Sequence, residues 1–296
     1  MIFSVVVPTH NRLETLKICL AALKSQRFSG SDYEVIVVDD GSQDGTLDYL
    51  KSIVWEQPNL KVFSQRNMGP AAARNLGIRS AIGQIIAFTD DDCLVGDDWL
   101  SRLYAGYQDF PQAAGMGGYL EAPKEVLGKS VIARLEYFET HVIYKAGQEA
   151  YLGGFESPAG GTNNISYLKR VIDQVGLFDE GFPVPAGEDA DFKLRVVAKG
   201  YKIGYIPLKV AHLDPYSLRS FMRRSINHGI GSAFFESKHH QSKNLVGILV
   251  GFFLWPRVFV KSFRSSQDLA LSLLMTAKDF LMNIGRFRYW SGDYKE

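Results

Sequence analysis

Apolar and polar residues alternate in blocks along the first hundred positions. Four short, almost continuously apolar runs predict buried parallel strands, at residues 3–9, 34–40, 60–65 and 84–90. Helical spacing of leucines between residues 13 and 23 predicts a helix after the first run, and further helices are expected at 45–54 and from Pro70 onward. This alternation predicts an α/β fold with a mainly parallel sheet sandwiched by helices.

Polar clusters follow three of the predicted strands. "PTHNR" comes after the first, "DDGSQDGT" after the second and "DDD", which is Asp90, Asp91 and Asp92, after the fourth. Ligands bind at the carboxyl ends of parallel strands, so these clusters mark a candidate site. Three adjacent carboxylates repel one another, and a positive group is expected among them. The alternative is a solvated acidic loop.

Local capping is expected at two helix starts. Asn11 with Glu14 fits a capping box for the first helix, and Asp97 and Asp98 fit caps for the helix that begins near Trp99. Trp99 itself is expected in the core.

Composition and charge add two constraints. The 296 residues are 46% hydrophobic, which is enough for a large core. Residues 1–200 hold 19 Lys and Arg against 26 Asp and Glu, a net charge of −7, whereas residues 201–296 hold 14 against 6, a net charge of +8. The acidic N-terminal part suits a cation-binding site, and the basic C-terminal part suits binding to an anionic surface. Only two cysteines and an N-terminus without a basic leader predict a reduced, cytoplasmic protein without a signal peptide.

Five motifs occur in a fixed order: "SVVVPTHNR", "VIVVDDGSQDGT", "RNMGPAAARNLGI", "FTDDDC" and, at residues 187–195, "GEDADFKLR". In order and spacing they resemble family 2 glycosyltransferases of the GT-A fold, over roughly residues 1–215. The resemblance implies transfer of a sugar from a nucleotide-sugar donor to a hydroxyl acceptor, with inversion and with a divalent metal.

The resemblance assigns the acidic cluster to the metal and the donor. Asp92 matches the family's direct metal ligand, and Asp90 matches a residue near the metal and the ribose. Asp91 is expected to contribute to donor binding, with the least defined role of the three. A His at the end of a later strand is the third ligand in many such enzymes, and here His212 ends the strand-like run "YKIGYIPLKVA". Oxygen ligands suit Mg²⁺ or Mn²⁺, and imidazole can serve Mn²⁺.

The nucleotide is expected at the ends of the first two strands. Asp39 can accept from a base N–H, and Thr9 can bond to the same base. The family uses matching positions commonly for uracil, so a UDP-sugar is favoured. Pro8, Asn11 and Arg74 complete the predicted donor site, although Arg74 could instead form a surface salt bridge.

Proton removal from the acceptor needs another carboxylate. The family motif assigns the base to Asp189 and an acceptor-binding role to Glu188; simple capping of the following helix is the alternative. Asn163 and Asn164, in the Gly-rich stretch "SPAGGTNNIS", can bind acceptor hydroxyls. Asp191 and Arg195 are four apart and are expected to pair.

Residues 216–296 are predicted to form a helical, basic and apolar extension after a transferase domain at 1–215. The uncharged run 245–256 is too short to span a bilayer. We expect an interfacial helix pair on anionic lipid, peripheral on the cytoplasmic face, with six basic partners: Lys243, Arg257, Lys261, Arg264, Arg286 and Arg288. The alternative is a helix buried on the core or in a homo-oligomer.

The expected acceptor is a hydroxyl in polysaccharide or glycolipid synthesis, including a lipid-linked one, and nucleic acid is not an expected partner. Two other function classes remain open. A sugar-phosphate nucleotidyltransferase also binds nucleotide and metal, but "PTHNRLET" lacks its Gly-rich phosphate loop. A non-catalytic nucleotide-sugar-binding scaffold at the membrane would bind donor without turnover.

Overall fold

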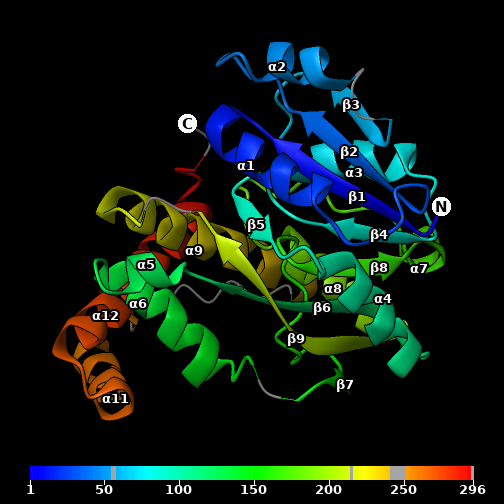
Figure 1. The fold of residues 1–296 in the computed structure, drawn as a ribbon. Coiled ribbons are helices and arrows are strands. Elements are labelled where there is room, and N and C mark those ends of the chain that lie inside the picture. Colours follow the sequence, from blue (N-terminus) through cyan, green and yellow to red (C-terminus); the bar gives the residue numbers. More distant parts are fainter. Residues whose placement is uncertain (55–57, 148, 214–215, 241–250, 295–296) are drawn as a thin grey trace. The chain divides into compact units, whose positions relative to one another are not determined.

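The computed structural model describes residues 1–54, 58–147, 149–213, 216–240 and 251–294. The chain forms two compact units, whose elements are labelled in Figure 1. The first unit comprises Met1–Glu121, Tyr144–Glu180 and Asp189–Leu213. The second comprises Ala122–Ile143, Gly181–Glu188 and Asp214–Glu296. Its long C-terminal segment begins next to the predicted boundary at residue 215, and two earlier segments join it; the boundary itself stays a prediction.

One sheet runs through the first unit, and its parallel half was predicted. In the described residues its order is β3-β2-β1-β4-β8-β6-β9-β5, with β7 paired to β9. β1 pairs in parallel with β2 and β4, and β2 with β3, whereas β8, β5 and β7 are antiparallel to their neighbours. The strands are β1 (Phe3–Thr9), β2 (Tyr33–Asp39), β3 (Leu60–Ser64), β4 (Ile85–Phe88), β5 (Cys93–Val95), β6 (Ala113–Glu121), β7 (Tyr151–Gly153), β8 (Ile165–Leu168) and β9 (Lys202–His212).

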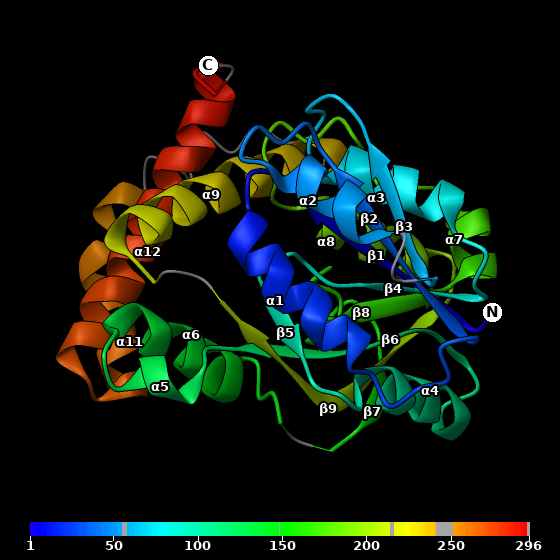
Figure 2. The same ribbon diagram turned by 45° about the horizontal axis from the view of Figure 1, so that its top comes forward.

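Helices cover both faces of this sheet because the strands are apolar on both sides. Val5 and Val7 of β1 pack into one core layer and Val6 into the other. The first layer lies under α1, which is in front of the strands in Figure 2, and includes the fully buried Trp99, as predicted. Helices of the first layer are α1 (Leu13–Lys24), α2 (Thr46–Ile53) and α4 (Trp99–Asp109), and those of the second are α3 (Pro70–Ser80), α7 (Lys169–Val175) and α8 (Glu188–Ala198).

The predicted caps are wrong in detail. Asn11 has a φ of 52° and uses its side-chain oxygen to accept from Gln43 N at 2.7 Å, so it does not cap α1. Asp44, from the loop after β2, accepts from Leu13 N at 3.0 Å instead. At α4, Asp98 occupies the N-cap position without a side-chain cap bond.

Helices build the second unit. They are α5 (Lys124–Leu127), α6 (Val131–Phe138), a short π-helical turn η2 (Glu139–Ile143), α9 (Leu218–His240), α11 (Trp255–Ser266) and α12 (Leu269–Ser291). Glycines allow α9 and α12 to cross closely: a Cβ on Gly229 would lie 2.0 Å from Met282 O, and one on Gly285 would lie 2.1 Å from Ile226 O. Lys278 pairs with Glu139 at 2.7 Å and ties α12 to η2.

The apolar run 245–256 falls partly outside the described residues, as does Lys243. Within the part of the chain that is described, no helix has the length and the apolar character needed to cross a bilayer.

Candidate active site

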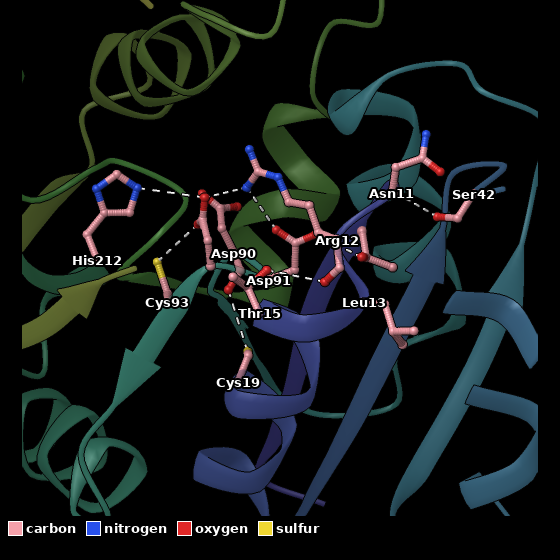
Figure 3. Close-up of polar contacts among 12 residues, drawn as sticks. Asn11, Arg12, Leu13, Thr15, Cys19, Ser42, Asp90, Asp91, Cys93 and His212 are labelled. Carbon is pink, nitrogen blue, oxygen red and sulfur yellow. Dashed lines mark hydrogen bonds and ion pairs between the residues drawn. The ribbon is translucent and has the colours of Figure 1, made fainter. Parts of the chain in front are cut away.

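The carboxyl ends of four strands carry the polar residues of the candidate site. Thr9 and Asp39 end β1 and β2 and are register partners, and Asp90, Asp91 and Asp92 follow β4. His212 ends β9 and is paired with Cys93 in the antiparallel β5–β9 ladder, which places the imidazole beside the acidic segment. In Figure 3, His212 and Arg12 approach this segment from opposite sides.

Two arginines compensate the three adjacent carboxylates. Arg74 Nη2 lies 2.8 Å from Asp90 Oδ1, and Arg12 Nη1 lies 3.0 Å from Asp91 Oδ1 and also contacts Asp92. Arg74 is 4% exposed, so the alternative of a surface salt bridge is wrong: its carboxylate partner belongs to the acidic segment. The positive charge expected from the sequence is therefore supplied by protein side chains in this structure.

Asp91 and Asp92 differ in their electrostatics. Burial raises the pKa of Asp91 to about 6, although Arg12 and a 2.7 Å hydrogen bond from the Thr9 hydroxyl act in the opposite direction. Burial also acts to raise the pKa of Asp92, but the nearby imidazole of His212 and the charge of Arg12 outweigh it and lower that pKa to about 2. Asp92 thus stays ionised far into the acidic range, whereas Asp91 takes up its proton near pH 6.

The donor set fits a hard divalent cation. His212 Nε2 lies 3.7 Å from Asp92 Oδ2, and Leu213 N donates to Asp92 O at 2.8 Å, which fixes the two residues side by side. Carboxylate oxygens with one imidazole suit Mn²⁺. Over the described ranges, no three His, Cys, Asp or Glu side chains are already gathered as a metal cluster, and Arg12 lies against the carboxylates instead.

Asp39 has spare capacity to accept hydrogen bonds. Its side chain is fully buried and, among the residues that the structure describes, accepts two long bonds, from Ser42 N at 3.3 Å and from Ser64 Oγ at 3.2 Å. A buried carboxylate with weak partners can accept from a base N–H. Thr9, predicted to contact the same base, directs its hydroxyl hydrogen to Asp91, and the buried Pro8 precedes it on β1.

Asp40, by contrast, organises the turn after β2. It is 4% exposed and accepts from Met68 N, Gly69 N and Gln65 Nε2, each at 2.8 Å. It thereby holds the loop that leads into α3. Asn11, the remaining predicted donor residue, links two loops through Gln43 N and through its own N–H, which donates to Ser42 Oγ at 2.9 Å.

The two predicted catalytic carboxylates begin α8. Glu188 is 5% exposed, and Asp189 is half-buried, with Oδ1 accepting from Ala190 N at 2.7 Å. The predicted pairing on this helix is confirmed, since Arg195 Nε lies 2.8 Å from Asp191 Oδ2.

The comparisons with known proteins agree with these motifs. The profile described as Glycosyl transferase family 2 matches residues 4–154, and that of Glycosyl transferase family group 2 matches residues 85–290. The chain belongs to glycosyltransferase family 2.

Relatives of this family 2 protein include glycosyltransferase AglE of Haloferax volcanii, 42% identical over 100 residues that make up 33% of each chain. A second is dolichyl N-acetyl-α-D-glucosaminyl phosphate 3-β-D-2,3-diacetamido-2,3-dideoxy-β-D-glucuronosyltransferase of Methanococcus voltae, 24% identical over 238 residues, which cover 76% of this chain and 71% of that protein. The match to YfnE of Bacillus subtilis spans 60% of that protein. The chain thus spans less than two thirds of several curated relatives.

Solved structures show the same fold. A mannosyltransferase of Pyrobaculum calidifontis, in complex with GDP-Man and Mn²⁺, aligns with a TM-score of 0.67 at 17% identity, over 96% of this chain and 86% of that one. TarS of S. aureus in complex with UDP-GlcNAc aligns with a TM-score of 0.58 at 19% identity, over 99% of this chain and 92% of that one. The predicted GT-A fold is confirmed.

One predicted site residue of the family 2 protein is a structural residue. Asn164 is 2% exposed; its amide donates to Tyr119 O at 3.0 Å and Leu208 O at 2.8 Å, and its oxygen accepts from Trp99 Nε1 at 2.9 Å. These bonds join β6, β8, β9 and α4, so the acceptor role predicted for Asn164 is wrong. Its neighbour Asn163 is half-buried, and its acceptor-binding role stays a prediction.

Two basic residues were not singled out from the sequence. Arg12 is part of "PTHNR", but no local pattern shows that it reaches a segment about 80 positions away. Lys193, 7% exposed, lies one helical turn after Asp189 and donates to Ser157 O. Burial lowers its pKa to about 8, although Asp189 and Glu156 act to raise it. Its spacing from Asp189 is the signal that could have identified it.

Proposed function

We propose that this family 2 protein transfers a sugar, with inversion, from a nucleotide-diphosphate donor to a hydroxyl acceptor in polysaccharide or glycolipid synthesis. A UDP-sugar is the favoured donor. The observation that carries the proposal is that Asp39, the acidic segment 90–92 and His212 all lie at the carboxyl ends of strands of one sheet, β2, β4 and β9, with His212 3.7 Å from Asp92.

Asp39 would accept from the nucleotide base, because its carboxylate is buried and weakly bonded. Asp92, Asp90 and His212 would hold Mn²⁺ or Mg²⁺. When bound, such an ion acts as a Lewis acid for charge on the leaving diphosphate. Arg12 contacts Asp92, so ion binding at this carboxylate requires Arg12 to give up that contact. Arg74, buried against Asp90, supplies a second positive charge on the donor side.

Asp189 would act as the general base. It takes the proton of the acceptor hydroxyl while the oxygen forms a bond to the anomeric carbon, and the bond from that carbon to the diphosphate oxygen breaks. Attack opposite the leaving diphosphate gives inversion. Glu188 and Asn163 would orient the acceptor.

The names of two relatives support the acceptor class. One acts on a dolichyl-linked sugar phosphate and another, from Bacillus spizizenii, is a poly(ribitol-phosphate) β-glucosyltransferase. Both cysteines of the present chain, Cys19 and Cys93, are free and buried, which suits the proposed cytoplasmic location.

Calorimetric titration with UDP, GDP and dTDP, each with Mn²⁺ and with a chelator, tests the donor site. We expect metal-dependent binding of UDP that is lost in Asp92→Ala and weakened in Asp39→Ala. Asp97→Ala is the matched control, because Asp97 is an exposed carboxylate that pairs with Arg27. Absence of nucleotide binding under every condition would overturn the proposed site.

Turnover distinguishes the enzyme from a binding scaffold. UDP release from UDP-sugars should be measurable with the wild type, and Asp189→Asn should retain UDP binding while losing release. Tight donor binding with no release in the wild type, across UDP-sugars and hydroxyl acceptors, would favour the scaffold.

A further inference from the structure

Helix α11 presents an amphipathic outer face. Pro256, Val260 and Arg264 recur at intervals of four, and Arg257 and Lys261 form the adjacent row, so these five side chains share one side of the helix. Together they line an open groove of about 460 Å³. The opposite side contains the buried Ser262 and packs within the second unit.

Exposed apolar side chains lie on this face of α11 and at its start. Val260 and Phe263 are exposed on the face, since Phe263 follows Pro256 by seven positions, whereas Phe253, 82% exposed, precedes the helix and Trp255, 56% exposed, begins it. Exposure of apolar side chains to water costs free energy, and such a surface marks a place that another phase or molecule covers.

The cations on α11 are not neutralised within the described part of the chain. No ion pair to a carboxylate involves Arg257, Lys261 or Arg264 there, and residues 255–266 contain no Asp or Glu. Two other predicted lipid contacts are different: Arg286 lies 3.7 Å from Glu236, and Arg288 lies 3.7 Å from Asp293. Of the predicted lipid contacts that the structure describes, the three without a carboxylate partner therefore all lie on α11.

We propose that this face of α11 docks the protein on an anionic lipid bilayer. The helix lies in the interface, with Val260 and Phe263 among the acyl chains and the three cations at lipid phosphates. A second copy is a poorer occupant, because a two-fold contact between α11 helices brings like charges together. Nucleic acid would leave the exposed aliphatic and aromatic side chains without an apolar partner. The proposal is independent of sugar transfer.

Cosedimentation of the full chain with vesicles tests the proposal. We expect binding to vesicles of phosphatidylcholine with phosphatidylserine, little binding to phosphatidylcholine alone, and weakening with added salt. The triple variant Arg257→Gln/Lys261→Gln/Arg264→Gln should lower the partition coefficient roughly 100-fold, about fivefold for each cation.

A charge-matched variant separates α11 from net charge. Arg79, Lys129 and Arg170 are exposed elsewhere, and their triple change to Gln should leave partition within about twofold of the wild type, because cations outside the contact are screened. Phe263→Trp should add a component with blue-shifted emission on vesicles and with quenching by brominated acyl chains, which the wild type lacks.

Equal vesicle binding by the α11 triple variant and the wild type would overturn the proposal, and so would equal losses in both triple variants. A dimer in sedimentation without lipid that the α11 triple variant abolishes would identify a second copy as the occupant. UDP titration of the α11 variants should match the wild type, which keeps failure of docking distinct from failure of the proposed donor site.

Discussion

Arg12 donates from Nη1 to Asp91 Oδ1 across 3.0 Å, so a residue of the first loop neutralises a carboxylate that follows the fourth strand. The same nitrogen contacts Asp92. A guanidinium thus lies among the carboxylates of the acidic segment and offsets part of their mutual repulsion. An ion that binds there competes with Arg12.

Arg12→Gln should make the protein more dependent on metal. The variant loses about 1–3 kcal/mol of stability, since two largely buried carboxylates lose a charged partner. Added Mn²⁺ should raise its melting temperature more than that of the wild type, because the ion no longer displaces a cation. Arg27→Gln, which breaks only the exposed pair with Asp97, is the control. An equal Mn²⁺ shift in Arg12→Gln and the wild type would contradict this competition.

Asp40→Asn should destabilise the loop before α3. An amide offers one acceptor oxygen in place of two, so one of the bonds from Met68 N, Gly69 N and Gln65 Nε2 is lost, at a cost of about 1–3 kcal/mol. Urea unfolding measures the change. Asp48→Asn, at an exposed position, should stay within about 0.5 kcal/mol of the wild type. Similar midpoints for the two variants would show that Asp40 does not hold the loop.

Gly285→Ala should separate α9 from α12. Its Cβ would lie 2.1 Å from Ile226 O, so backbone must move, and we expect a loss of about 1–3 kcal/mol in thermal unfolding. Gly128→Ala is the control, because its Cβ meets nothing within 4 Å. If Gly285→Ala unfolds at the same temperature as the wild type, α9 and α12 do not approach each other as closely at Gly285 as the structure shows.

Glu34→Gln should give a pH-dependent loss of stability. Burial acts to raise the pKa of Glu34, but hydrogen bonds from Ile82 N, Lys61 and Ser4 outweigh it, so the folded-state pKa is lowered. The stabilisation is complete above the unfolded pKa of about 4.3 and disappears as the pH falls through the lowered folded value.

The difference in unfolding free energy between wild type and Glu34→Gln should therefore be constant near neutral pH and shrink below about pH 4. Denaturant titrations across this range measure it. A difference that stays constant to low pH would mean that the charge of Glu34 contributes nothing.

Much of the first unit could be predicted from periodicity alone. The runs that became β1, β2, β3 and β4 were each placed within two residues, because strands buried on both faces are apolar throughout. The antiparallel pairing of β8 between β4 and β6 was not predicted, since it joins segments about 50 to 80 positions apart and leaves no local signal.

Part of the candidate site could also be predicted from the sequence. Motif order identified the acidic segment, but the partners of each carboxylate depend on contacts between distant residues. Arg74 forms an ion pair with Asp90, and the Thr9 hydroxyl donates a hydrogen bond to Asp91. Neither pairing follows from the spacing of these residues in the sequence. The acceptor role predicted for Asn164 was wrong because its side chain forms hydrogen bonds with three buried groups of the core. A polar residue in a Gly-rich stretch gives no sign of such bonds in the sequence.

The ladder between β5 and β9 has a consequence for the order of assembly. Cys93 and His212 are register partners although they are more than a hundred positions apart. During synthesis the carboxylates emerge long before the imidazole, and the two meet only when the last strand of the sheet has paired. A nascent chain that ends before residue 212 carries the acidic segment without its histidine. The complete set of proposed ligands therefore comes together only after β9 has paired in the sheet.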